Sequence, residues 1–184
     1  NGELLDEDND ASDWIEIYNP TAEAVNLRDW ALTDDENQPQ KWLFPEVTLE
    51  ANGYLVVFAS GKDRDNAGSE LHTNFRLSGS GEYFALFDPD GIAATEFVPA
   101  FPDQQADVSY GYYEDTYVGF TVPTPGTAND QSGAKLLPAP EFNKKHGFYD
   151  TPFNLEISSS VEDVEIYYTT DGSTPDMGGT IYAS

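Results

Sequence analysis

The chain has 184 residues, of which 34 are acidic and 8 are basic, so its formal net charge is −26. An electric field of this sign repels nucleic acid and anionic lipid, because proteins bind both mainly through Lys and Arg. The absence of cysteine excludes a disulfide framework and thiolate metal sites. Aromatic residues make up 14% of the chain, which favours a folded protein over a disordered one.

The first two thirds of the chain contain short runs in which apolar and polar residues alternate, separated by Gly, Pro, Asn and Asp. This pattern is typical of half-buried β-strands. The run 54–59 is apolar throughout and predicts a central strand that is covered on both faces. The other early runs are 15–18, 30–33 and 47–49.

A hairpin is predicted where the runs 83–87 and 92–98 flank Asp88-Pro89-Asp90-Gly91. Pro presets φ for the first central turn position, and Gly accepts the positive φ that closes the turn. Strands recur about every eight to twelve residues and no amphipathic helix is evident. The sequence therefore predicts an all-β fold.

The alternation stops near residues 124–129 and starts again after a polar, Pro-bearing stretch. We expect a first domain over 1–129, a linker over 130–139 and a second, partial β module over 140–184. In the second module, alternating apolar residues predict one strand through 153–157 and another through 164–168. Only about 45 residues follow the linker, fewer than usually support an independent core, so we expect this module to be cut short.

Several motifs of the first domain resemble the lamin-tail domain as found in bacterial surface and secreted proteins. The resemblance implies an immunoglobulin-like β-sandwich and a secreted or cell-surface location. Members of that family usually begin with an apolar strand, so we also expect an opening edge strand to be missing here. The motifs that carry the resemblance lie at residues 13–20, 27–34, 42–45, 53–58, 71–77, 109–111 and 124–129.

The second module resembles the small β-sandwich at the C-terminus of chitobiase-type hexosaminidases. The resemblance rests on Phe148-Tyr149-Asp150 and on the run 166–175, which contains Tyr-Tyr-Thr-Thr-Asp-Gly. Proteins with this pair of modules often continue into a domain that resembles the CotH kinases. We therefore expect the chain to be a fragment of a larger exported protein.

One cluster of carboxylates has the spacing of a calcium loop. Asp6, Asp8 and Asp10 alternate with other residues as the first ligands of an EF-hand do. Ala11 stands where an EF-hand needs Gly and Ile17 where it needs the bidentate Glu, so an EF-hand is excluded. The three aspartates remain candidate ligands of an irregular calcium site, but a solvated acidic loop is the favoured interpretation. No other cofactor is expected.

Catalytic patterns are missing from the sequence. His72 precedes a predicted strand and is interpreted as a packing or hydrogen-bonding residue, and His146 as part of a solvated turn. No Gly-x-Ser-x-Gly context exists for a serine nucleophile. The run Ser78-Gly79-Ser80-Gly81 lacks the Lys of a phosphate-binding loop and is interpreted as a turn. We therefore expect the chain not to be an enzyme.

Four tyrosines gather in one region, at positions 110, 112, 113 and 117. Exposed aromatic rings could stack on sugars, whereas buried ones would close the sandwich, and we favour burial.

The leading hypothesis is a non-catalytic interaction or structural module that contacts a protein partner or neighbouring domains of the same polypeptide. A carbohydrate-binding module is the first alternative, with an extracellular glycan as partner. An accessory domain of a CotH-kinase-like enzyme, whose catalytic part lies outside this fragment, is the second.

Overall fold

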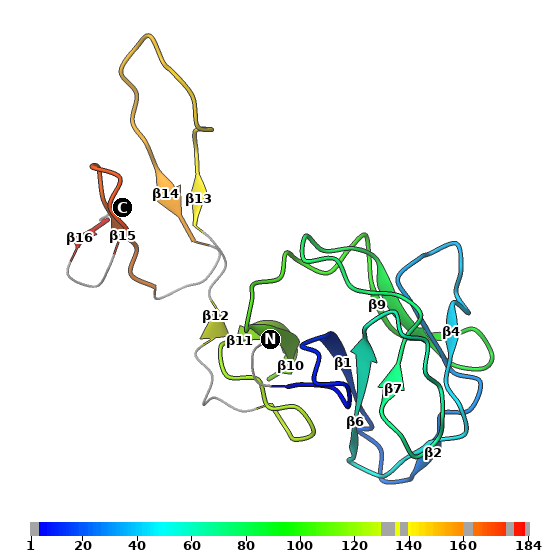
Figure 1. The fold of residues 1–184 in the computed structure, drawn as a ribbon. Coiled ribbons are helices and arrows are strands. Elements are labelled where there is room, and N and C mark those ends of the chain that lie inside the picture. Colours follow the sequence, from blue (N-terminus) through cyan, green and yellow to red (C-terminus); the bar gives the residue numbers. More distant parts are fainter. Residues whose placement is uncertain (1–3, 130–134, 137–139, 160–163, 176–178, 183–184) are drawn as a thin grey trace. The chain divides into compact units, whose positions relative to one another are not determined.

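A computed structural model describes residues 4–129, 135–136, 140–159, 164–175 and 179–182 (Figure 1). The chain divides into two compact units, Asn1–Lys135 (unit 1) and Leu136–Ser184 (unit 2). The described residues form strands and turns and contain no helix, so the all-β prediction is confirmed. Accordingly, none of the described residues forms a helix that could cross a membrane.

The first sheet of unit 1 has β6 at its centre, as the apolar run of that strand predicts. β6 (Tyr54–Ala59) pairs antiparallel with β1 (Asp13–Tyr18) and parallel with β7 (Leu71–His72), in the order β1-β6-β7. The register pairs Ile15 with Val57 and Ile17 with Leu55, so these four side chains share one face. That face turns inward, because Ile17 and Val57 are buried.

The second sheet has the order β4-β3-β8-β9 and is antiparallel throughout. Its strands are β3 (Ala31–Thr33), β4 (Trp42–Leu43), β8 (Phe84–Phe87) and β9 (Ala93–Phe97). The predicted hairpin joins β8 to β9: the Gly91 N–H donates to Asp88 O at 3.0 Å, and Gly91 has φ 76°. Two short strands, β2 (Val25–Asn26) and β5 (Thr48–Leu49), pair separately.

The core of unit 1 draws side chains from both of these sheets, as in an immunoglobulin-like sandwich. Leu32 from β3 and Val57 from β6 are fully buried. The remaining buried members of the cluster are Ile17, Leu27, Trp42, Phe44, Leu49, Leu71, Phe75, Phe84, Leu86 and Phe101. Trp42 is therefore a core residue, and Trp30 packs against the edge of the cluster.

Unit 1 ends in a hairpin of β10 (Ser109–Tyr113) and β11 (Thr116–Phe120), and β12 (Lys135–Leu136) pairs next to β11. The turn residues Glu114 and Asp115 have φ 46° and 65°. Both therefore occupy the left-handed region that hairpins usually fill with Asn-Gly. Glu-Asp is not one of the usual two-residue signals for a tight hairpin turn.

Unit 2 contains two small antiparallel ladders. β13 (Glu141–Phe142) pairs with β14 (Ile157–Ser158), and β15 (Tyr167–Tyr168) pairs with β16 (Thr180–Ile181). The two strands predicted here are thus shorter than expected. Residues 153–156 lie outside a strand, because the ladder with β13 is only two residues long.

Candidate functional site

The acidic loop 6–10 folds around the carboxylate of Asp6. The Asp6 N–H donates to Asp10 O at 3.0 Å and the Asn9 N–H to Asp6 O at 2.8 Å, with Asn9 at φ 64°. Asp6 Oδ1 accepts the N–H groups of Asp8 and Asp10, each at 3.0 Å. Its Oδ2 accepts the Ser12 hydroxyl at 3.1 Å. The Asp6 side chain is fully buried, so this loop is an ordered structure.

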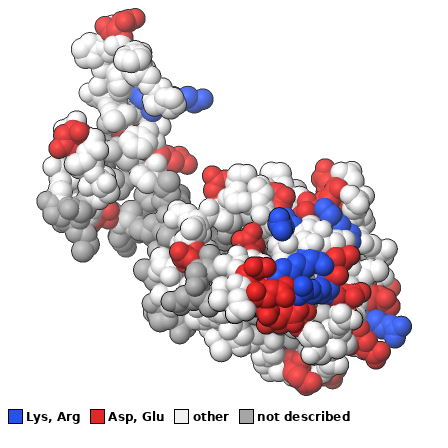
Figure 2. Space-filling view, in the orientation of Figure 1, with Lys and Arg blue, Asp and Glu red and all other residues white. Residues whose placement is uncertain are grey.

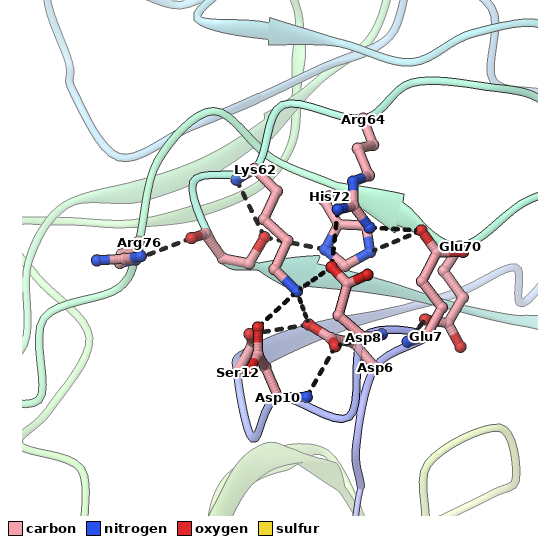
Figure 3. Close-up of polar contacts among 11 residues, drawn as sticks. Asp6, Glu7, Asp8, Asp10, Ser12, Lys62, Arg64, Glu70, His72 and Arg76 are labelled. Atoms are coloured by element: carbon pink, nitrogen blue, oxygen red, sulfur yellow. Dashed lines mark hydrogen bonds and ion pairs between the residues drawn. The ribbon is translucent and has the colours of Figure 1, made fainter.

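The structure brings the three predicted ligands together and adds a lysine. Carboxylate oxygens of Asp6, Asp8 and Asp10 lie within 4.8 Å of one another. Lys62, from the segment after β6, reaches all three, with Nζ at 2.6, 2.7 and 2.9 Å from them (Figure 3). The ammonium therefore sits at the point where the carboxylates converge. Whether calcium also binds there stays a prediction.

Proton affinities in the cluster follow from this geometry. Burial on its own raises the pKa of Asp6, but the hydrogen bonds from Lys62 and from the N–H groups of Asp10 and Asp8 hold that pKa far below its usual range. The hydrogen bonds of Asp8 to Lys62 and Arg64 lower the pKa of Asp8. For Lys62, desolvation lowers the pKa, but the three carboxylates outweigh it and raise the pKa. Asp6, Asp8 and Lys62 are thus all ionised at neutral pH.

Arg64 extends the network to a second residue of the acidic loop. Its guanidinium contacts Glu7 Oε1 at 2.6 Å and Asp8 Oδ2 at 2.7 Å. The Glu7 N–H donates to the Glu70 carboxylate just before β7. Two cations from the loop between β6 and β7 therefore fasten the N-terminal acidic loop to the sheet. Figure 2 shows the same interleaving on the surface of unit 1, where blue Lys and Arg atoms lie among red Asp and Glu atoms.

His72 is buried beneath this network. Its side chain has no exposed surface, its ring stacks on Phe58 at 5.2 Å, and its Nδ1 lies 2.9 Å from Ser60 Oγ. Ser60 Oγ also accepts the N–H of Lys62 at 3.1 Å. His72 Nε2 faces Glu7 Oε1 at 3.9 Å, beyond hydrogen-bond distance. The predicted packing and hydrogen-bonding role of His72 is therefore what the structure shows, and a Ser-His pair this deeply buried cannot reach a substrate.

The two segments that the sequence analysis interpreted as turns also carry no catalytic arrangement among the described residues. Ser78–Gly81 forms a turn closed by the Gly81 N–H and Ser78 O at 3.1 Å. His146 is exposed in unit 2. Neither position carries a constellation of acid, base and nucleophile among the described residues.

The tyrosine region is more exposed than predicted. Tyr110 and Tyr113 are half-buried, but Tyr112 is 55% exposed and Tyr117 is 38% exposed. The reason is that β10 and β11 form a separate hairpin instead of a central part of either sandwich sheet, so one face of the hairpin stays open. The sequence could not reveal this, because Glu114-Asp115 carries no standard hairpin signal.

Comparison with known families gives two matches. The model of the Lamin Tail Domain family matches residues 3–99, more than half of the chain. The model of the Chitobiase/beta-hexosaminidase C-terminal domain matches residues 144–184. Both resemblances found in the sequence are therefore confirmed, in the order expected. No match was found among curated proteins or among solved structures.

Proposed function

We propose that this chain, which belongs to the lamin tail domain family, is a non-catalytic interaction or structural module of a secreted or cell-surface multidomain protein. Its partner would be another protein or a neighbouring domain of the same polypeptide. The family shares an immunoglobulin-like fold that serves many functions, so the function of this chain depends on its own side chains.

The proposal is supported mainly by two potentially reactive side chains, His72 and Lys62, which are both engaged in contacts inside the domain. His72 is buried against Phe58 and Ser60. Lys62, a potential base or nucleophile, is held by three carboxylates that raise its pKa, which is the opposite of what a nucleophilic lysine needs. Catalysis would require such groups to be exposed in a pocket with poised pKa values. Here His72 and Lys62 are both held in contacts within the domain.

A specific observation favours carbohydrate binding as a second candidate. Tyr112 and Tyr117 present large exposed ring surfaces on one hairpin. Residues 144–184 match a domain named for chitobiase and beta-hexosaminidase, and this match supports a carbohydrate-associated role.

A turnover assay tests the non-catalytic part of the proposal. The purified chain is incubated with glycoside, ester, peptide and phosphoester substrates, beside a His72→Gln variant and a Tyr18→Ala control that changes only an exposed ring. We expect no turnover above background for any of the three proteins. A rate that survives purification to homogeneity, is lost in His72→Gln with its fold retained, and persists in Tyr18→Ala would overturn the proposal.

A further inference from the structure

Three tyrosine rings share one face of the β10–β11 hairpin. The register places Tyr112 opposite Tyr117, and Tyr110 opposite Gly119. Because Gly119 has no side chain, space is left beside Tyr110. The ring of Tyr117 stacks on that of Tyr110, with centroids 5.6 Å apart and planes 23° apart. Tyr112 meets Tyr117 edge to face at 5.2 Å. The result is a contiguous aromatic surface.

This surface is anchored at one end and open at the other. Phe97 of β9 contacts Tyr117 at 5.0 Å and Tyr110 at 6.3 Å, which fixes the inner end. Exposure then rises to 38% at Tyr117 and 55% at Tyr112. The opposite face of the hairpin is packed instead: Tyr113 contacts Phe120, which is 2% exposed. Phe97 therefore holds the inner end of the aromatic surface in place, and the outer end is exposed to solvent.

The turn of the hairpin is strained and acidic. Glu114 and Asp115 both have positive φ, a conformation that Asn-Gly would adopt at lower cost. Strain of this kind often marks a position retained for function. Asp115 Oδ1 lies 3.5 Å from the Tyr112 hydroxyl, so a carboxylate borders the most exposed ring.

We infer that the surface formed by Tyr110, Tyr112 and Tyr117, bordered by Asp115, binds a sugar chain that carries no negative charge, and that amino groups on the sugar strengthen binding. This inference rests on the second candidate function, carbohydrate binding. The apolar C–H face of a sugar ring packs on a tyrosine ring, while a carboxylate accepts its hydroxyl or amino hydrogens. The net charge of −26 repels uronate, sulfate or phosphate groups. A protonated amine is attracted both by Asp115 and by the ring faces.

Calorimetric titration of the full chain tests the inference with three defined probes: a glucosamine hexamer, its N-acetylated counterpart and polygalacturonate. We expect binding to the first two, with tighter binding of the glucosamine hexamer that weakens as salt is added. Polygalacturonate should not bind. Tyr112→Ala and Tyr117→Ala should each weaken binding at least tenfold. The matched control is Tyr18→Ala, because Tyr18 is 46% exposed and stacks on Tyr54 elsewhere in unit 1, and it should bind as the wild type does.

A double variant separates function from stability. Glu114→Asn with Asp115→Gly installs the preferred turn, so the melting temperature should rise. Binding of the glucosamine hexamer should fall because the bordering carboxylate is lost. Absence of binding to both hexamers, or equal loss of binding in Tyr18→Ala and Tyr112→Ala, would overturn the inference. Neither result would contradict the proposed function as a non-catalytic interaction module, which is tested separately by binding to cells and by the assay for turnover.

Discussion

Lys62 connects parts of the chain that lie more than fifty positions apart, because its ammonium bonds the carboxylates of Asp6 and Asp8. The spacing of the aspartates could be seen in the sequence and made them candidate calcium ligands, but the sequence favoured a solvated acidic loop, whereas the structure buries the Asp6 side chain. The lysine could not be predicted, because nothing local links the segment after β6 to the N-terminal loop. The one available signal was the net charge. Residues 1–129 hold 25 acids and only 5 bases, so a base beside the acidic loop reduces the repulsion among its carboxylates.

Replacing Lys62 tests its role as the internal cation. Lys62→Met keeps most of the length of the side chain but removes the cation that contacts Asp6 and Asp10, and leaves Asp8 with Arg64 alone, so the melting temperature at pH 7 should fall by several degrees. Lys41→Met is the control, because Lys41 forms an ion pair with one carboxylate, that of Asp34, beside a cation–π contact with Phe75, and its effect should be smaller. Thermal unfolding followed by circular dichroism measures both.

The effect of Lys62→Met should depend on pH with a defined sign. In the wild type the pKa of Asp6 lies far below its usual value, so its contribution is present at neutral pH and is lost progressively as pH falls below about 5. Without the ammonium, crowding raises the carboxyl pKa values, so protonation stabilises the folded variant as pH falls. The gap in melting temperature between wild type and variant should therefore narrow from pH 7 to pH 3. A gap that widens would contradict this account of the cluster.

Calcium can be tested in the same pair of proteins. If Asp6, Asp8 and Asp10 bind calcium, millimolar calcium should raise the melting temperature of the wild type, and Asp8→Asn should abolish the rise. The ammonium of Lys62 competes for the same oxygens, so Lys62→Met should gain more from calcium than the wild type does. Magnesium at equal ionic strength is the control. Unchanged melting curves in both proteins would leave only an ordered acidic loop.

At the scale of elements, the predictions succeeded where local chemistry decides the structure. The apolar run of β6 and the Asp88-Pro89-Asp90-Gly91 turn were both identified from residue type alone. The parallel pairing of β6 with β7 was not, because it depends on the path of the chain through 60–70. The β10–β11 hairpin was also missed, since Glu114-Asp115 is an unfavourable turn sequence that the surrounding structure enforces.

The turn before β8 offers a sharp test of the packing. Gly81 has φ 77°, and a Cβ there would lie 2.1 Å from Phe101 O, a backbone atom. Gly81→Ala should therefore lower the free energy of unfolding by about 3 kcal/mol or more. Gly68→Ala is the matched control, because Gly68 has φ 89° but nothing lies within 4 Å of its Cβ position. It should cost only about 1–2 kcal/mol, the price of the backbone conformation. Equal costs in urea unfolding would contradict the packing around Gly81.

At the scale of the whole molecule, charge sets the expectation for nucleic acid. Four of the five bases of residues 1–129 pair with acids: Arg28, Lys41, Lys62 and Arg64. The fifth, Arg76, donates to Ser60 O. Few cations remain to release counterions from DNA, so no binding to duplex DNA is expected at physiological salt. Micromolar, salt-sensitive binding in an anisotropy titration would contradict this.

The central claim is that the chain binds a partner without transforming it, and its most direct test is saturable binding to intact cells of the producing organism. The fluorescently labelled 184-residue chain is titrated onto these cells, with unlabelled chain as competitor and an equally charged unrelated protein as control. The account predicts saturable, competable retention of intact chain and no chemical change in the bound partner. Retention no greater than that of the control protein, or release of a cleaved or modified partner, would contradict it.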